Sequence, residues 1–211
     1  MTEPDIWGIV LAAGTGSRFG GRKQHVEIAG RTLWQWAASA LRAAGVDNLA
    51  VVGPVAGGID GGPRRRDSVA AGLAAVPDHV TYVAVHDAAR PLAPPDMIRR
   101  LVDLIRTSNA DGVVPGLAVA DTIKRVDADG TVIATVDRSD LVAVQTPQLF
   151  RAASLREAHA ADASDATDDA ALIERWGGVV RVAEGDPANL KITYPIDLAL
   201  AVAVIADRAG A

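Results

Sequence analysis

The chain has 211 residues, 49% of them hydrophobic, and carries a formal net charge of −5. The length and the hydrophobic share suit one globular domain over residues 1–211. The negative charge argues against a broad nucleic-acid-binding surface. The absence of cysteine excludes disulfides, thiolate metal sites and cysteine nucleophiles. No apolar run approaches the roughly 18 residues of a membrane span and no secretion signal precedes the first predicted strand, so we expect a cytoplasmic protein without membrane or nucleic-acid partners.

The first predicted element is a strand over residues 6–11, where a short apolar run suits burial in a sheet. The small residues that follow are Ala12, Ala13, Gly14, Thr15 and Gly16, and three cations come next: Arg18, Arg22 and Lys23. Backbone N–H groups in such a turn can converge on an anion. We therefore expect a polyphosphate site, with an ordinary glycine-rich strand-to-helix turn as the alternative. The spacing fits neither a P-loop nor a dinucleotide fingerprint.

The next predicted element is a helix that begins at Leu33. Thr32 with Gln35 forms a capping-box pattern before it, and Gly45 ends it. A strand over residues 49–52 follows. Residues 53–62 contain five glycines and a proline, which is too broken a pattern for a full helix.

Two more helices and two more strands complete the first half of the chain. Asp67 or Ser68 is expected to cap a helix over residues 68–76. Strands are predicted at residues 81–85 and 112–118, separated by a helix that starts near Pro95 or Asp96. This alternation predicts an α/β fold, a doubly wound, Rossmann-like, mostly parallel sheet covered by helices.

The pattern then changes to a β-hairpin over about residues 119–139, because Asp129-Gly130 is a hairpin turn signal between two β-rich segments. A long hairpin inside an α/β domain would project from it, and an isolated hairpin is marginal in water. We therefore expect this arm to pack on a second copy of the chain. The alternative is an arm that folds back on its own domain.

The C-terminal part returns to mixed elements. A strand over residues 142–145 leads into TPQLF, and a helix is expected at residues 152–161. Thr167 is expected to cap a helix with Asp168 and Asp169 in its first turn. Short strands are predicted at residues 179–182 and 190–193, and Pro195 starts a last helix with a buried apolar face.

Six motifs in order carry a family resemblance. They are LAAGTGSRFGGRKQ, VHDAARP at residues 85–91, DTIKR at 121–125, TPQLF at 146–150, TDDAALIE and NLKIT. As a set they closely resemble the 2-C-methyl-D-erythritol 4-phosphate cytidylyltransferases of the non-mevalonate isoprenoid pathway, over about residues 9–198. The resemblance implies Mg²⁺-dependent (or other divalent-cation-dependent) cytidylyl transfer from CTP to that phosphate, giving CDP-methylerythritol and pyrophosphate. It also implies a homodimer whose arms exchange.

The resemblance assigns roles to individual residues. The catalytic cations are Arg18, Lys23 and Lys191. The CTP-binding residues are Ala12, Ala13, Gly14, Thr15, Gly16, Gly62 and Ser68. The acceptor-binding residues are Arg90, Thr122, Arg138, Thr146 and Thr167. Asp87 is the metal ligand, and its place just past the end of a predicted strand also suits a ligand site.

Some assignments stay open. His86 is expected to be structural, and Asp186 is not assigned as a second metal ligand. The run Arg64 to Arg66 is either local positive charge for an anionic ligand or a solvated loop. The alternatives for function are a cytidylyltransferase acting on another polyol phosphate, such as ribitol 5-phosphate, and a non-catalytic nucleotide-binding relative.

Overall fold

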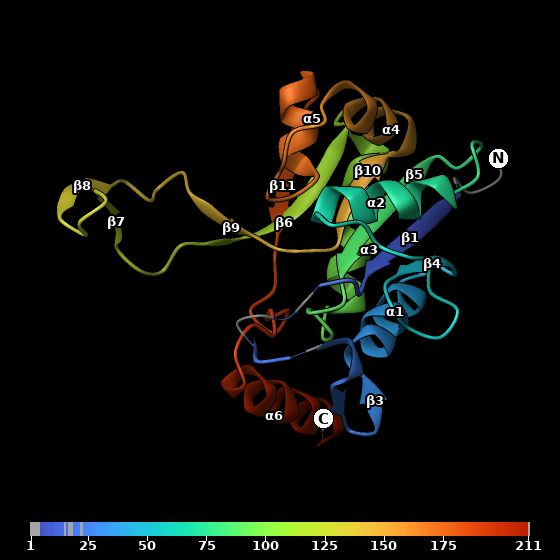
Figure 1. Cartoon of the computed structure of the whole chain (residues 1–211), viewed down its shortest axis with the longest axis horizontal. Helices are drawn as coiled ribbons and strands as arrows, with labels where there is room; N and C mark the ends of the chain where they lie inside the picture. Colours follow the sequence, from blue (N-terminus) through green and yellow to red (C-terminus); the bar gives the residue numbers. More distant parts are fainter. Residues whose placement is uncertain (1–4, 15, 17–18, 22, 211) are drawn as a thin grey trace.

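The computed structural model describes residues 5–14, 16, 19–21 and 23–210, and a seven-stranded sheet forms its centre (Figure 1). The strands follow the order β11-β6-β10-β5-β1-β4, and β9 pairs with β6. Their bounds are β1 Ile6–Leu11, β4 Asn48–Val52, β5 Tyr82–Asp87, β6 Gly112–Ala118, β9 Val142–Val144, β10 Gln148–Arg151 and β11 Val180–Glu184. The β1–β4, β1–β5 and β6–β11 pairs are parallel, whereas β10 runs antiparallel to both β5 and β6. The predicted mostly parallel sheet is confirmed.

Helices cover both faces of this sheet. Their bounds are α1 Leu33–Ala43, α2 Arg65–Ala74, α3 Pro95–Thr107, α4 Ala152–Ala161, α5 Ala170–Trp176 and α6 Ile196–Gly210. One buried cluster joins α1 and α3 to the sheet through residues such as Val10 and Ala84. A second joins α2, α4 and α5 through Ile9 and Val83. Neighbouring strand residues thus enter opposite clusters, as the two-residue period of a strand requires, and the doubly wound arrangement is confirmed.

A smaller subdomain-like region lies below the sheet in Figure 1, where α6 packs on the segment that follows β1. This segment contains the short helix η2 Lys23–His25 and the strand pair β2 Glu27–Ile28 and β3 Arg31–Thr32. Its small core includes Ile28, Leu33, Ile192 and Ala201. The helix–strand packing therefore brings the chain on either side of Ile192 next to the segment that begins at Lys23.

The predicted hairpin is present and projects from the body as an arm (Figure 1). Its strands β7 Ile123–Val126 and β8 Val132–Val136 pair antiparallel, with Ile123 opposite Val136. Apolar side chains on the arm are exposed, including Val132 at 55% and Ile133 at 58%. The alternative in which the arm folds back on its own domain does not hold in this structure.

Two predicted helix starts are wrong. Helix α2 begins at Arg65, earlier than a cap at Asp67 or Ser68 would allow, because the Asp67 carboxylate accepts the N–H of Arg64 at 3.2 Å from the third position of the helix. Thr167 does not cap α5, which begins at Ala170. The Asp168 carboxylate instead accepts the N–H of Ala171 at 3.0 Å.

The C-terminal segment differs from its prediction in one further way. Residues 190–193 are irregular rather than a strand, although the N–H of Ile192 donates to the Ala89 carbonyl at 2.7 Å. Helix α6 starts after Pro195 as predicted, and its expected buried face is present, because Ala201 is buried and Leu198 and Val204 pack against the small core. Its other face is exposed, with Ile196 at 66% and Leu200 at 53%. Among the described residues, no helix is long and apolar enough to cross a membrane.

Candidate active site

A pocket of about 370 Å³ opens at the carboxyl ends of β1 and β5. Nine of the residues predicted for catalysis, CTP binding or metal binding line it: Ala12, Ala13, Gly14, Gly16, Lys23, Gly62, Ser68, Asp87 and Lys191. They come from segments nearly 180 positions apart in the chain. The edge of a parallel sheet where the strands end is the place where open α/β folds hold their ligands. The fold therefore assembles one site from the separate motifs.

The glycine-rich turn is held close to its neighbours by backbone contacts. The N–H of Ala12 donates to the Val52 carbonyl at 2.7 Å. Gly16 has a φ of +68°, and a Cβ there would lie 2.0 Å from the carbonyl oxygen of Gly21. A side chain at Gly16 would therefore both strain the backbone and clash with the turn, which explains the need for glycine at this position.

The start of α2 and the segment before it form another part of the pocket lining. The Ser68 hydroxyl accepts the N–H of Gly62 at 3.2 Å, and Ser68 is only 4% exposed. This hydrogen bond fixes the segment before α2 against its first turn. Ser68 was predicted to bind CTP directly, whereas here its hydroxyl also holds the shape of this part of the lining.

Asp87 ends β5 and lies between two cations. Its Oδ2 atom is 2.8 Å from Lys191 Nζ, and its Oδ1 atom is 3.6 Å from Arg65 Nε. Burial by itself would raise the pKa of the Asp87 carboxyl, but Arg65 and Lys191 outweigh it and hold the pKa below its ordinary value. Asp87 is therefore a carboxylate at neutral pH, with its charge directed at the pocket.

The backbone of Asp87 is fixed from behind by Thr146. The Thr146 hydroxyl accepts the N–H of Asp87 at 3.0 Å and lies 2.9 Å from His86 Nδ1. His86 is fully buried, and this burial lowers its pKa to about 4, so its ring is neutral at pH 7. His86 is thus structural, as expected. Thr146, predicted to bind the acceptor, is 6% exposed and uses its hydroxyl inside the protein.

The structure describes two of the three cations that were predicted to be catalytic, Lys23 and Lys191. Lys23 begins η2, and its Nζ atom donates to the Ile192 carbonyl at 2.8 Å. Lys191 precedes that residue and pairs with Asp87. Both lysines line the pocket, so the lining carries positive charge that suits an anionic ligand.

The three consecutive arginines at the start of α2 are not a solvated loop. Arg66 is 7% exposed and donates to the His159 and Ser164 carbonyls at 3.0 and 3.1 Å. Arg64 and Arg65 line the pocket. Arg65 also pairs with the buried Asp169, at 2.6 Å from Nη1 to Oδ2. Sequence reasoning did not assign Arg65 to the site, although the run of cations was the signal that could have found it.

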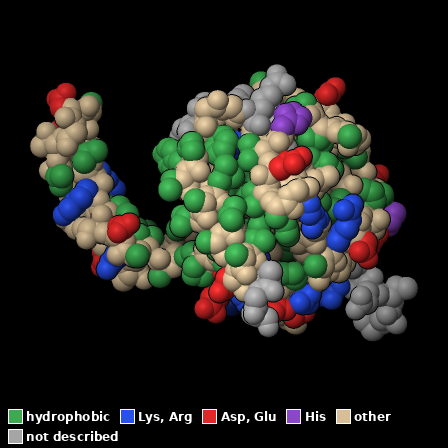
Figure 2. Space-filling view, turned by 90° about the horizontal axis from the view of Figure 1, so that it is seen from below, with side chains coloured by type: hydrophobic (Ala, Val, Ile, Leu, Met, Phe, Trp, Pro, Cys, Tyr) green, Lys and Arg blue, Asp and Glu red, His purple; other side chains and the backbone are tan. Residues whose placement is uncertain are grey.

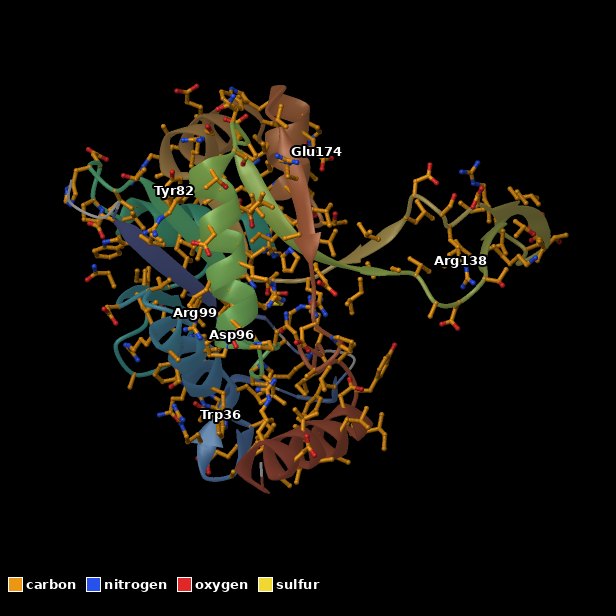
Figure 3. All side chains as sticks on the ribbon, turned by 180° about the vertical axis from the view of Figure 1, so that it is seen from behind. Trp36, Tyr82, Asp96, Arg99, Arg138 and Glu174 are labelled. Carbon is orange, nitrogen blue, oxygen red and sulfur yellow. The ribbon has the colours of Figure 1, made fainter. Side chains whose placement is uncertain are left out.

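The remaining predicted acceptor residues lie outside the pocket lining. Arg90 donates to the Asn189 carbonyl at 2.8 Å, and burial lowers its pKa. Thr167 is exposed before α5. Thr122 and Arg138 are exposed at the open end of the β7–β8 hairpin. Figure 3 shows Arg138 on the arm, away from the sheet and its helices.

Four residues of the first motif, Thr15, Ser17, Arg18 and Arg22, lie outside the described residues. The predicted roles of Thr15 in CTP binding and Arg18 in catalysis therefore stay predictions. The described neighbours Gly14, Gly16 and Lys23 all line the pocket.

The described residues fit a divalent cation only together with a substrate. Asp87 is the one carboxylate among the described residues that line the pocket. No group of three or more His, Cys, Asp or Glu side chains in that part of the chain is arranged to hold a metal. The Asp186 carboxylate accepts the N–H of Ala188 at 2.8 Å and is not part of the described lining. Mg²⁺ commonly takes one or two carboxylates from a protein and the rest of its ligands from phosphates and water, which this arrangement permits.

Comparison with known proteins agrees with the geometry. Residues 6–207 match the family model described as 2-C-methyl-D-erythritol 4-phosphate cytidylyltransferase. A protein of that name from Nocardia farcinica (strain IFM 10152) is 46% identical over 226 residues, covering 99% of this chain and 97% of the relative. Another, from Rhodococcus jostii (strain RHA1), is 45% identical over 217 residues and covers 95% of each chain.

A solved structure of the same family is also similar to this chain. The crystal structure of 2-C-methyl-D-erythritol 4-phosphate cytidylyltransferase from Thermus thermophilus superposes with a TM-score of 0.81 at 32% identity, covering 95% of this chain and 98% of that one. The chain therefore belongs to the 2-C-methyl-D-erythritol 4-phosphate cytidylyltransferase family and is a nucleotidyltransferase.

Proposed function

We propose that this chain transfers a cytidylyl group from CTP to 2-C-methyl-D-erythritol 4-phosphate, with release of pyrophosphate, and that it needs Mg²⁺ or another divalent cation. The observation that carries the proposal is the convergence of Lys23, Asp87 and Lys191 with the glycine-rich turn in one pocket. A non-catalytic nucleotide binder would have no need to bring both lysines to the carboxylate side of that turn.

The reaction joins two anions. An oxygen of the acceptor phosphate attacks the α-phosphorus of CTP, a new P–O bond forms, and the bond to the β-phosphate oxygen breaks to release pyrophosphate. Because the reagents repel each other, positioning and charge neutralisation supply most of the acceleration. When bound, a divalent cation held by Asp87 would offset the negative charge of the phosphates.

The residues of the chain divide this work. The turn through Gly14 and Gly16 lies where its backbone can follow the triphosphate. Lys23 and Lys191 offset negative charge on the reacting phosphates, and Asp87 would hold the cation. Gly62 and Ser68, which the resemblance assigns to CTP binding, also line the pocket and would contact the cytosine.

The test is pyrophosphate release from CTP and Mg²⁺ with four acceptor conditions: 2-C-methyl-D-erythritol 4-phosphate, ribitol 5-phosphate, glycerol 3-phosphate, and no acceptor. Release with methylerythritol phosphate alone is expected. Release with ribitol 5-phosphate instead would keep the chemistry and change the substrate. No release under any condition, while CTP still binds, would refute the proposal. Omission of the divalent cation should abolish release.

We further infer that the chain acts as a homodimer whose arms exchange. Thr122 and Arg138 lie on an arm that leaves its own body, so they reach a pocket only if a second copy brings one to them. Figure 2 shows hydrophobic side chains gathered on the side of the body that faces the arm. The exposed apolar residues of the arm, such as Val132 and Ile133, also suit burial against another copy.

Hybrid dimers test this arrangement. Arg138→Ala and Lys23→Ala should each be nearly inactive alone. In an equal mixture, half of the dimers are hybrids with one intact site, so about a quarter of wild-type activity should return. Arg125→Ala, which removes another exposed arginine of the arm, is the matched control and should keep its activity. If hybrids form and no activity returns, the shared site is refuted.

A further inference from the structure

The Arg65 guanidinium lies between two carboxylates of different kinds. On one side, Nη1 is 2.6 Å from Asp169 Oδ2, a direct charged hydrogen bond. On the other, Nε is 3.6 Å from Asp87 Oδ1, which is too long for a hydrogen bond. Asp87 faces the pocket, whereas the Asp169 side chain is 1% exposed. The buried Asp169 carboxylate therefore holds Arg65 beyond hydrogen-bond distance of the Asp87 carboxylate in the pocket.

Asp169 is itself fixed by a second donor. His159 Nε2 lies 3.0 Å from Asp169 Oδ1, and because a carboxylate accepts, this nitrogen carries the proton. His159 comes from α4, Asp169 precedes α5, and Arg65 belongs to the first turn of α2. Each oxygen of the buried carboxylate thus binds one donor from a different helix, which leaves Asp169 little freedom to move.

The surrounding backbone is fixed as well. Arg66 Nη2 donates to the His159 carbonyl at 3.0 Å, Nη1 donates to the Ser164 carbonyl at 3.1 Å, and Nη1 also contacts the Asp162 carbonyl. Arg64 Nη1 donates to the Ala163 carbonyl at 2.8 Å. The start of α2 is therefore tied to the segment between α4 and α5 on both sides of Arg65. The position of Asp169 relative to Asp87 follows from this framework.

We propose that Asp169 is a positioning residue for cytidylyl transfer: it holds the Arg65 guanidinium back from Asp87 and so keeps the Asp87 carboxylate accessible to the divalent cation. The proposal rests on the proposed function. Without the charge of Asp169, Asp87 is the nearest carboxylate left to Arg65. The guanidinium would then close on Asp87 and compete with the cation for the same oxygen.

The size of the competition follows from Coulomb's law. Shortening the Arg65–Asp87 contact from 3.6 Å to about 2.8 Å, at an effective dielectric constant of about 20, strengthens the pair enough to weaken cation binding about tenfold. Asp168 is the matched control. It is the adjacent carboxylate, but its oxygens bind Gln148 Nε2 at 2.7 Å and the N–H of Ala171 at 3.0 Å instead of Arg65.

The experiment measures Mn²⁺ binding by the loss of its free EPR signal, with cytidine 5′-(α,β-methylene)triphosphate at saturation for each variant. Asp169→Asn should raise the Mn²⁺ dissociation constant about tenfold, and Asp168→Asn should leave it within about twofold. The same ordering is expected for the Mg²⁺ concentration that gives half-maximal turnover, with a smaller change in the turnover number at saturating Mg²⁺.

A second background separates positioning from a general structural effect. Since Asp169 acts through Arg65, Asp169→Asn should have no further effect on Mn²⁺ binding in a chain that already carries Arg65→Gln. An unchanged dissociation constant for Asp169→Asn, or the same tenfold change in the Arg65→Gln background, would overturn the proposal. If Asp169→Asn does not fold, the Arg65→Gln variant alone tests the proposal. Mn²⁺ should then bind this variant at least as tightly as wild type, and weaker binding contradicts competition between Arg65 and the cation.

Failure of the wild type to bind Mn²⁺ would refute the proposed function as well, whereas wild-type binding with no effect of Asp169→Asn refutes this inference only.

Discussion

Replacement of Asp87 by Asn tests the charge balance of the pocket through stability as well as activity. In the wild type the carboxylate offsets Lys191 at 2.8 Å and Arg65 at 3.6 Å. The amide removes the counter-charge of Lys191 and leaves Arg65 with Asp169 as its charged partner. A charged hydrogen bond contributes about 1.5–3 kcal/mol, and Lys191 is 44% exposed, so solvent screening reduces its part. We expect a loss of about 2 kcal/mol at pH 7.

The loss should depend on pH with a definite sign. The pKa of Asp87 in the folded protein lies below its ordinary value, so its contribution is present above the unfolded pKa and falls as pH drops toward the folded pKa. With an unfolded pKa of about 3.9, the contribution at pH 3 is about 1.3 kcal/mol smaller than at pH 7, because the unfolded carboxyl takes up a proton while the folded one stays ionised. The difference between wild type and Asp87→Asn should therefore shrink to about 0.7 kcal/mol at pH 3.

Urea unfolding of both proteins at pH 7 and pH 3 measures this difference directly, because all other titrating groups are common to the two chains. The activity of Asp87→Asn should be lost at low and at high Mg²⁺ concentration. A stability difference that is the same at pH 7 and pH 3 would refute the ionised, cation-paired state of Asp87. Normal Mg²⁺-dependent turnover in the variant would refute its role as metal ligand.

Three further predictions concern the framework around the site. Phe150→Ala should lower the free energy of unfolding by about 3–5 kcal/mol, measured by urea unfolding, because Phe150 is fully buried in the core between the sheet and α4. Gly16→Ala should weaken binding of the methylene CTP analogue about tenfold or more, measured by calorimetry, because the new Cβ would meet the carbonyl of Gly21. Arg66→Met should cost about 3 kcal/mol and make the chain sensitive to protease near Ser164, because the carbonyls that Arg66 now binds would lose their donor.

Two patterns that depend on near neighbours predicted local structure correctly, although the local caps predicted for α2 and α5 were wrong. The capping residue Gln35 accepts the N–H of Thr32 at 2.9 Å, and the helix begins where that pattern places it. Asp129-Gly130 forms the predicted turn between β7 and β8. In each case the interaction spans only a few residues, so the sequence contains both partners within one window.

Patterns that depend on distant partners were predicted poorly. Residues 190–193 have the composition of a strand, but the N–H of Ile192 donates to the Ala89 carbonyl at the edge of the site rather than to a sheet. Helix α6 buries Ala201 and packs Leu198 on the small core, yet Leu200 of the same helix is also apolar and is 53% exposed. Hydrophobic periodicity shows which face of a helix is apolar, but it does not show whether the same chain covers that face.

The three arginines at the start of α2 show why the site could be predicted only in part. Their neighbours in the sequence are glycine, proline and aspartate, which is typical of a solvated loop. Their partners lie about 100 positions later: Asp169 for Arg65 and the His159 carbonyl for Arg66. Nothing within a local window distinguishes a cation that faces water from one that binds a buried carboxylate.

The acceptor half of the site depends on a still more distant partner. The family resemblance predicts that Thr122 and Arg138 bind the acceptor, yet the fold of one chain places them at the open end of an arm that projects from the body. A motif specifies which residue stands at a position, whereas assembly decides which pocket that residue serves. Because the arm exposes Val132 and Ile133 to solvent in a single chain, burial against a second copy would stabilise the same arrangement that completes the pocket. The stability of the dimer and the acceptor affinity should therefore fall together when these two side chains are made polar. A variant Val132→Ser with Ile133→Ser that dissociates while it keeps wild-type acceptor affinity would refute a shared site.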